Sequence, residues 1–219
     1  MACRLAIFDL DGTLADSFPW FLDAMPGVAD RFGFRRVAGP EEREMLRGLG
    51  PREVLRRLEV PRWRLPIIAR HVRRLKAESA GAIPLFPRVP CMLGALSGAG
   101  VVLALATSDS EANARRTLGA GNAALIRHWG CGAPLLGKPR ALRRVLRASG
   151  LPAEAAVFVG DEVRDAEAAR AAGIAFGAVA WGYGAAAALR AQRPAFVFER
   201  VAEVAPALLG GRSAPAAGG

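Results

Sequence analysis

The sequence has few of the cysteine and histidine residues that are typical of disulfide-rich or zinc-binding proteins. Its 219 residues include only three cysteines, Cys3, Cys91 and Cys131, an odd number with no metal-ligand spacing. The two histidines, His71 and His128, likewise have no partner at such a spacing. This pattern is typical of reduced thiols, and we expect a cytoplasmic protein.

The sequence also lacks a continuous apolar run suited to a membrane. The longest stretches without charge, 89–108 and 171–189, have the length of a span, but repeated glycines break both. The apolar residues near the start, 5–8, are too few for a secretory signal and lead directly into acidic residues. We therefore expect no membrane partner.

Lysine is almost absent from a strongly basic chain. The net charge is +10, yet only Lys76 and Lys138 among the 30 basic residues are lysines. Such a surface can bind nucleic acid or another polyanion, but a GC-rich coding sequence produces the same composition without any function. The arginines are spread along helical stretches with few aromatics between them, which favours the compositional interpretation and argues against a nucleic-acid partner.

Short apolar runs alternate with amphipathic segments over most of the chain. This order is typical of a parallel sheet with helices on both faces, an α/β fold of the doubly wound, Rossmann-like kind. The predicted strands are 4–9, 101–106, 156–159 and 174–180, and the predicted helices are 88–98, 110–118, 139–149 and 162–172.

One helical segment interrupts this alternation after the first strand. It is predicted to contain helices at 19–33, 40–47, 51–59 and 62–78, with an interruption at Pro26–Gly27 and a start or kink at Pro66. The expected organisation is an α/β core made of 1–16 and 82–209, a small all-α insert at 17–81, and a disordered tail at 210–219.

Two acidic residues lie at the end of the first predicted strand. Asp9 and Asp11 are two apart, so their side chains share one face at the carboxyl end of the strand, where open parallel sheets bind ligands. Carboxylates this close repel each other unless a cation joins them, which suits one nucleophile and one acid/base. The alternative is a simple hairpin turn at Asp11–Gly12, but the residues that follow do not alternate like a partner strand.

A second acidic pair follows the strand at 156–159. Asp161 and Asp165 lie four apart and therefore share one face of a helix. Asp161 has an ordinary explanation as a helix N-cap, whereas Asp165 lies a full turn inside, where capping effects have faded. A divalent ion such as Mg²⁺ would explain the pair, because it prefers carboxylate oxygens.

Two further positions suit phosphate binding. Thr107 and Ser108 follow a strand and offer hydroxyl and backbone N–H groups, although the same cluster can simply cap the next helix. Lys138, between Gly137 and Pro139, would place a compact ammonium beside a carboxylate and a phosphate. The alternative for Lys138 is a solvated loop lysine.

Taken in order, these pieces resemble the haloacid dehalogenase superfamily of phosphohydrolases. The family pattern begins with DxDGT, which Asp9 to Thr13 match. It continues with Thr or Ser after a strand, then Lys, then GDxxxD, and these are matched by Thr107, Lys138 and Gly160 to Asp165. The resemblance covers nearly the whole chain. Aspartate at Asp11 argues against the dehalogenase and phosphonate-cleaving branches of the superfamily.

The resemblance implies roles for individual residues. Asp9 would attack phosphorus, and Asp11 would protonate the leaving oxygen and then activate water. Mg²⁺ is the implied cofactor. Its implied ligands are Asp9, the backbone carbonyl of Asp11, and Asp161, with Asp165 either a further ligand or a residue that supports the ligands. Thr107 and Lys138 would hold the phosphoryl oxygens. Gly12, Thr13 and Ser108 would help to bind the substrate.

The insert at 17–81 resembles the helical cap of the phosphoglycolate phosphatase-like branch. Arg47, in the loop 47–50, would then contact a substrate anion, or else lie on a solvated helix face. The implied substrate is a small phosphomonoester: phosphoglycolate, a sugar phosphate or a nucleotide. The alternatives are a phosphomutase, a phosphate-binding regulatory module without turnover, and a nucleic-acid-binding protein. The sequence leaves the oligomeric state open.

Overall fold

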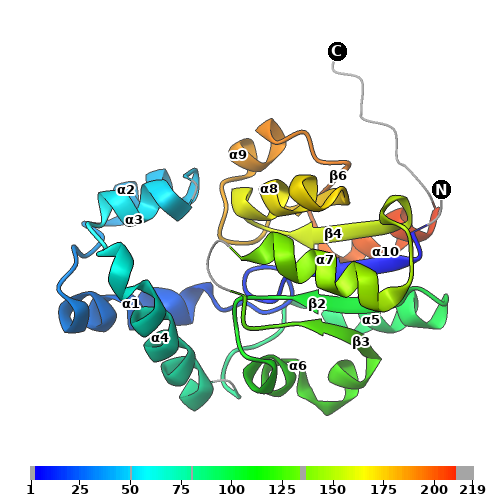
Figure 1. The fold of residues 1–219 in the computed structure, drawn as a ribbon, viewed down its shortest axis with the longest axis horizontal. Helices are drawn as coiled ribbons and strands as arrows, with labels where there is room; N and C mark the ends of the chain where they lie inside the picture. Colours follow the sequence, from blue (N-terminus) through cyan, green and yellow to red (C-terminus); the bar gives the residue numbers. More distant parts are fainter. Residues whose placement is uncertain (1–2, 50, 80, 134–136, 211–219) are drawn as a thin grey trace.

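The structure, a computed structural model, describes residues 3–49, 51–79, 81–133 and 137–210. Its centre is a six-stranded, all-parallel sheet with the strand order β3-β2-β1-β4-β5-β6 (Figure 1). The strands are β1 (Leu5–Phe8), β2 (Val102–Ala106), β3 (Ile126–Gly130), β4 (Ala156–Gly160), β5 (Ala175–Val179) and β6 (Phe196–Phe198).

The first strand of the chain lies in the middle of the sheet. All four residues of β1 are fully buried, as expected for a strand with neighbours on both sides and helices on both faces. Phe8, its last residue, pairs with Leu105 of β2 and Val159 of β4. The three central strands therefore end at one edge of the sheet, and the residue after each strand reaches that edge.

Alternate side chains of the strands point to opposite faces of the sheet and build two separate cores. One core joins Phe8 and Leu105 to α5, α6 and α10, and the other joins Ile7 and Phe158 to α7, α8 and α9. The doubly wound α/β prediction is confirmed. The helices are α5 (Val89–Gly98), α6 (Glu111–Leu125), α7 (Lys138–Ser149), α8 (Val163–Ala172), α9 (Ala186–Ala191) and α10 (Val201–Gly210).

The segment between β1 and α5 forms an all-helical insert, here defined as Phe18–Ser79, which lies to one side of the sheet (Figure 1). A small apolar cluster of its own holds it together, made of Val28, Leu46, Leu58, Val60 and Ile68. Its helices are α1 (Phe18–Phe32), α2 (Pro40–Arg47), α3 (Pro51–Arg57), a short 3₁₀ turn (Arg62–Arg64) and α4 (Leu65–Ser79).

Proline has different effects at two positions of the insert. Pro26 does not interrupt α1, which continues to Phe32, and the buried residues Val28 and Ala29 hold the helix against the rest of the insert. At Pro66 the expected start is seen, because α4 begins at Leu65 and places the proline in its first turn.

The edges of the fold differ most from the prediction. Strands β3 and β6 were not predicted: β3 is rich in polar and half-exposed residues such as Arg127 and His128, and β6 is only three residues long. Helix α6 extends beyond the predicted end to Leu125, with a kink at Gly119, where φ is 73°. Helix α10 includes Gly210, and the rest of the predicted disordered tail lies outside the described residues.

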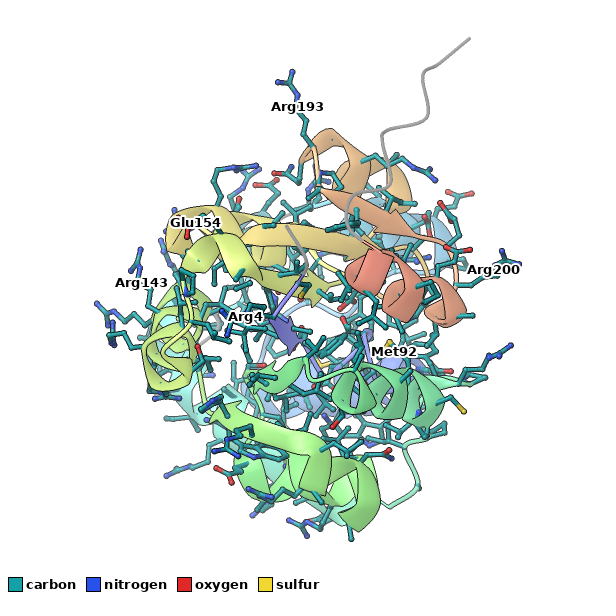
Figure 2. All side chains as sticks on the ribbon, turned by 90° about the vertical axis from the view of Figure 1, so that its right-hand side faces the viewer. Arg4, Met92, Arg143, Glu154, Arg193 and Arg200 are labelled. Carbon is teal, nitrogen blue, oxygen red and sulfur yellow. The ribbon has the colours of Figure 1, made fainter. Side chains whose placement is uncertain are left out.

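Two features of the exterior bear on possible partners. Arginines such as Arg143, Arg193 and Arg200 extend outward around the core (Figure 2). Within the described ranges, no helix combines the length and the apolar character needed to cross a bilayer.

Candidate active site

The site is built around Asp9, the first residue after β1. Its side chain is 3% exposed. Oδ1 accepts the backbone N–H of Leu10 at 2.8 Å, and Oδ2 accepts the ammonium of Lys138 at 2.5 Å. Burial raises the pKa of Asp9 to about 7; the positive charge of Lys138 opposes this rise and the negative charge of Asp165 adds to it. Asp9 is therefore a buried carboxyl in contact with the ammonium of Lys138.

Lys138 begins α7 and is buried, so the solvated-loop interpretation is excluded. Its Nζ lies 2.5 Å from a carboxylate oxygen of both Asp9 and Asp165. Burial acts to lower the pKa of Lys138, but the charges of Asp165 and Asp9 outweigh it and the pKa is raised. The lysine is thus held as a permanent cation between two carboxylates.

Asp161 follows β4 and is fully buried against the loop after β1. Oδ1 accepts the hydroxyl of Thr13 and Oδ2 accepts the backbone N–H of Tyr183, both at 2.8 Å. Burial is the largest cause of the raised pKa of Asp161, followed by repulsion from Glu162 and Asp165. Gly12 must be glycine here, since its φ is 76° and a Cβ would lie 2.2 Å from Asp161 Oδ2.

Asp165 has two roles at the start of α8. Its Oδ2 accepts the backbone N–H groups of Asp161 and Glu162, at 3.2 and 3.1 Å, while Oδ1 contacts Lys138. The N-cap of α8 is Glu162, in a reciprocal capping box with Asp165, and not Asp161 as the capping alternative supposed. Asp161 is therefore not needed to cap the helix.

The acidic residues at this edge outnumber the cations beside them. Asp9, Asp161, Glu162 and Asp165 face Lys138 and Arg164; oxygens of Asp9, Glu162 and Asp165 lie within 4.8 Å of one another. Carboxylate oxygens are the donors that Mg²⁺ prefers, and a divalent ion would balance the excess negative charge, so the donor set fits this cofactor. Glu162 was not predicted to belong to the site.

Thr107 and Ser108 lie where predicted, directly after β2. Thr107 is 1% exposed, and its Oγ1 accepts the N–H of Asp109 at 3.1 Å. The side chain that caps α6 is Ser110, whose Oγ accepts the N–H of Asn113 at 3.2 Å. Capping therefore does not account for the hydroxyl at Thr107.

Asp11 lies at the boundary between the core and the insert. Its Oδ1 accepts the hydroxyl of Ser17 at 2.6 Å and the ammonium of Lys76 at 2.5 Å. Lys76 comes from α4 and also pairs with Asp109 Oδ2 at 2.8 Å. Burial acts to lower the pKa of Lys76, but Asp11 and Asp109 outweigh it, so the pKa is raised.

Sequence reasoning missed Lys76, although a signal was present. The rarity of lysine singled out Lys138, and the same reasoning applies to the only other lysine of the chain. Both prove to be buried among carboxylates of the site.

Arg47 joins the insert to the core in this structure. Its guanidinium donates to the backbone carbonyls of Tyr183 and Gly182, at 2.7 and 3.1 Å, and pairs with Glu44 at 3.0 Å. It is therefore more than a solvated helix residue. The predicted loop 47–50 lies at this contact, except for Gly50, which is outside the described residues.

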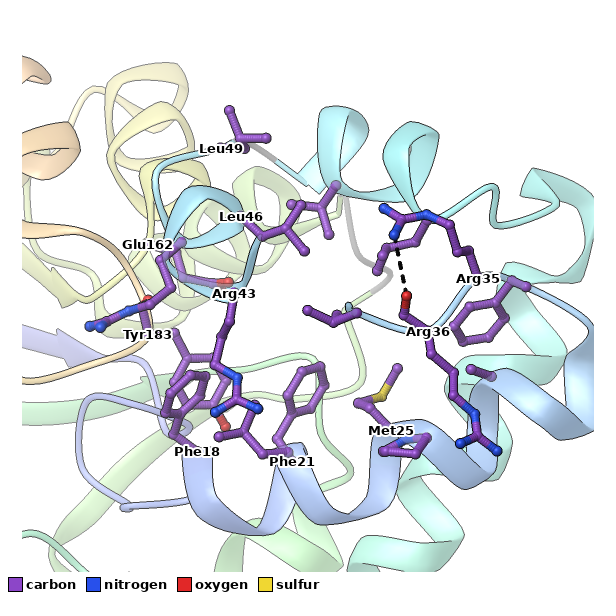
Figure 3. Close-up of a pocket in the computed structure, with 18 of the residues that line it drawn as sticks. Phe18, Phe21, Met25, Arg35, Arg36, Arg43, Leu46, Leu49, Glu162 and Tyr183 are labelled. Carbon is purple, nitrogen blue, oxygen red and sulfur yellow. Dashed lines mark hydrogen bonds between the residues drawn. The ribbon is translucent and has the colours of Figure 1, made fainter. Parts of the chain in front are cut away.

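A cavity of about 330 Å³ adjoins the site within the insert. Phe18, Phe21 and Met25 of α1 line it from one side and Leu46 from the other (Figure 3). Glu162, Tyr183 and Gly184 of the core also line it. The cavity therefore reaches the acidic cluster through Glu162.

Comparison with known proteins agrees with this geometry. Residues 6–179 match the family described as haloacid dehalogenase-like hydrolase. The chain is 32% identical to a phosphoglycolate phosphatase of Synechococcus elongatus over 92% of this chain and 95% of that protein. It is 30% identical to phosphoglycolate phosphatase 1 of Pseudomonas aeruginosa over 93% and 79% of the two chains.

Solved structures show the same fold. A putative phosphoglycolate phosphatase from Lactobacillus plantarum superposes with a TM-score of 0.79 at 20% identity, over 93% of this chain and 98% of that one. A variant of CbbY from Rhodobacter sphaeroides, in complex with xylulose-1,5-bisphosphate, has a TM-score of 0.64 at 22% identity, over 93% and 96%. The chain is a member of the haloacid dehalogenase-like hydrolase family, a phosphoric monoester hydrolase similar to the phosphoglycolate phosphatases.

Proposed function

We propose that the protein is a Mg²⁺-dependent phosphohydrolase that acts on a small phosphomonoester through a phosphorylated Asp9. The observation that carries the proposal is the buried contact of Asp9 with Lys138 at the edge where β1 ends. A carboxylate placed there, with a fixed cation beside it, suits attack on a phosphoryl group.

The reaction would proceed in two displacements at phosphorus. In the first, an oxygen of Asp9 bonds to phosphorus while the bond to the leaving oxygen breaks, and Asp11 gives that oxygen its proton. In the second, water attacks phosphorus, Asp11 takes the proton of the water, and the bond to Asp9 breaks to release inorganic phosphate. Lys138 and Thr107 hold the phosphoryl oxygens throughout.

The metal would be held by Asp9, the backbone carbonyl of Asp11, Asp161 and Asp165, with Glu162 beside them. When bound, it supplies positive charge that offsets the repulsion between substrate phosphate and these carboxylates. The pKa values of Asp9 and Asp161 are raised first by burial and also by repulsion from neighbouring carboxylates, and a bound cation would offset both effects.

The insert would act as a cap that excludes water and selects the leaving group. Contacts of Arg47 with the loop at 182–183, and of Lys76 with Asp11, support a closed arrangement over the site. The relatives named phosphoglycolate phosphatase support a small acidic substrate. The cavity, which is lined by apolar residues together with Arg35, Arg36, Arg43 and Arg47, favours testing larger leaving groups as well.

The test is phosphate release from a panel that includes phosphoglycolate, sugar phosphates, nucleotides and n-alkyl phosphates. Wild type and Asp9→Asn are compared with and without Mg²⁺. We expect release that needs both Mg²⁺ and Asp9, with the folded Asp9→Asn protein at least about 10³-fold slower.

The remaining alternatives give different results in the same assay. Transfer of the phosphoryl group to a second position of a sugar phosphate, without release, would indicate a phosphomutase. Mg²⁺ binding without turnover of any substrate would indicate a phosphate-binding regulatory module.

A further inference from the structure

The contact between Lys76 and Asp11 joins two parts of the chain that the sheet does not connect. Lys76 belongs to α4 of the insert, whereas Asp11 and Asp109 belong to the core. The lysine side chain is only 5% exposed, and its Nζ lies 2.5 Å from Asp11 Oδ1 and 2.8 Å from Asp109 Oδ2. A buried ammonium is costly unless such partners compensate it, so its position is closely specified.

The contacts on Asp11 fall on one of its two oxygens. Oδ1 accepts both the ammonium of Lys76 and the hydroxyl of Ser17, and the Ser17 oxygen in turn lies 2.7 Å from the hydroxyl of Tyr183. Within the described residues, no side-chain hydrogen bond to Oδ2 is seen. The carboxyl group is therefore held in place through Oδ1.

Docking of α4 on the core does not itself require Lys76. One turn earlier, Arg73 donates to the carbonyl of Ser108 at 3.3 Å, and its own carbonyl accepts the side-chain amide of Asn113 at 2.9 Å. The helix thus has a second set of contacts with the core that does not touch Asp11. This second set offers a matched control.

We propose that Lys76 is a positioning residue that reaches from the insert to orient Asp11 and to stabilise the carboxylate formed when Asp11 gives its proton to the leaving group. This inference rests on the proposed function and adds to it the dependence of proton transfer on the closed insert. An interaction that strengthens as charge develops on Asp11 lowers the barrier of that step. The step itself is unchanged: the proton of Asp11 moves to the leaving oxygen as its bond to phosphorus breaks.

The test compares two substrates whose leaving groups differ in how much they need a proton from a general acid. An n-alkyl phosphate leaves as a poor alkoxide and needs general acid catalysis, whereas p-nitrophenyl phosphate leaves as a stable anion and needs it little. Lys76→Met should lower kcat/KM for the alkyl phosphate by about 10²-fold or more, and for p-nitrophenyl phosphate by less than about 10-fold. Lys76→Arg keeps the charge in a different shape and should show the same selectivity, with smaller losses.

Arg73→Met is the control, and it should change both substrates by the same factor. Equal losses for both substrates in Lys76→Met and Lys76→Arg, matching the control, would mean that Lys76 only docks the helix and would overturn the proposal. If Lys76→Met does not fold, the substrate selectivity of Lys76→Arg decides. A wild-type protein whose turnover does not depend on Asp9 would overturn the proposed function as well, so the two failures are distinguishable.

Discussion

Two ion pairs of the same length lie in opposite environments. The Lys138–Asp165 and Arg56–Glu53 pairs both measure 2.5 Å. In the core, the two side chains are 5% and 0% exposed, whereas those in the insert are 75% and 33% exposed. Distance alone thus says little about what a pair contributes. Burial decides, because water screens the exposed pair while the buried one has no substitute for its partner.

The basic residues of this chain also differ between the site and the surface. Both lysines are buried against carboxylates of the site, while arginines such as Arg143, Arg193 and Arg200 extend outward (Figure 2). A compact ammonium can lie between two carboxylates at one point, whereas a guanidinium is broader and planar. Both lysines therefore lie at the site, where Arg164 also pairs with Glu162.

The largest effect on stability is expected at the buried pair. Lys138→Met leaves Asp9 and Asp165 without their shared cation and should lower the free energy of unfolding of the metal-free protein by about 3–5 kcal/mol. Denaturant unfolding at neutral pH measures this. A loss below about 1 kcal/mol would mean that the buried pair contributes no more to stability than a surface pair does.

A smaller effect should appear in the pH dependence of Asp9. The pKa of Asp9 rises from 3.8 to about 7 in the folded protein. Between these values the folded state keeps a proton that the unfolded chain has lost, so raising the pH lowers stability. Metal-free Asp9→Asn should therefore gain stability relative to wild type as the pH rises from 4 to about 7, by up to about 4 kcal/mol over the whole range.

Thermal or denaturant unfolding of both proteins across that pH range checks the prediction. Mg²⁺ should reduce the difference by stabilising the wild type, because the ion binds the ionised carboxylate. A difference that stays flat with pH would show that Asp9 ionises as readily in the folded protein as in the unfolded chain.

The smallest effect is expected at the exposed pair. Arg56→Gln removes a contact that water already screens, so it should change the free energy of unfolding far less than Lys138→Met does. The same denaturation experiment, repeated at high salt, should leave no measurable effect. A loss comparable to that of Lys138→Met would remove the distinction between the two regions.

The central part of the fold and site was accessible from sequence because several local signals agree there. Apolar runs without alternation predicted β1, β2, β4 and β5, and the polar residues after β1, β2 and β4 had to meet at one edge of the sheet. Asp9, Lys138 and Asp165 are indeed in direct contact. Their proposed roles as nucleophile, cation and metal ligand stay predictions.

The parts that escaped prediction depend on contacts between distant segments. Edge strand β3 contains the polar residues Arg127 and His128, and β6 has only three residues, so neither gives the long apolar run of a central strand. Glu162 reads in sequence as one more acid of a helix start, and only folding brings it to Asp9. Lys76 lies 65 residues from Asp11 in the chain, so its contact depends on how the insert packs on the core.

The most direct test of the account is to stop the reaction with acid during turnover and search for phosphate on the protein. The account predicts an acid-stable, alkali-labile phosphoryl group on the peptide that contains Asp9, formed only with Mg²⁺ and absent in Asp9→Asn. Mass spectrometry of the digested protein locates it. Rapid turnover with no phosphorylated peptide under rapid quench, or with the group on another residue, would contradict the assignment of Asp9 as the nucleophile.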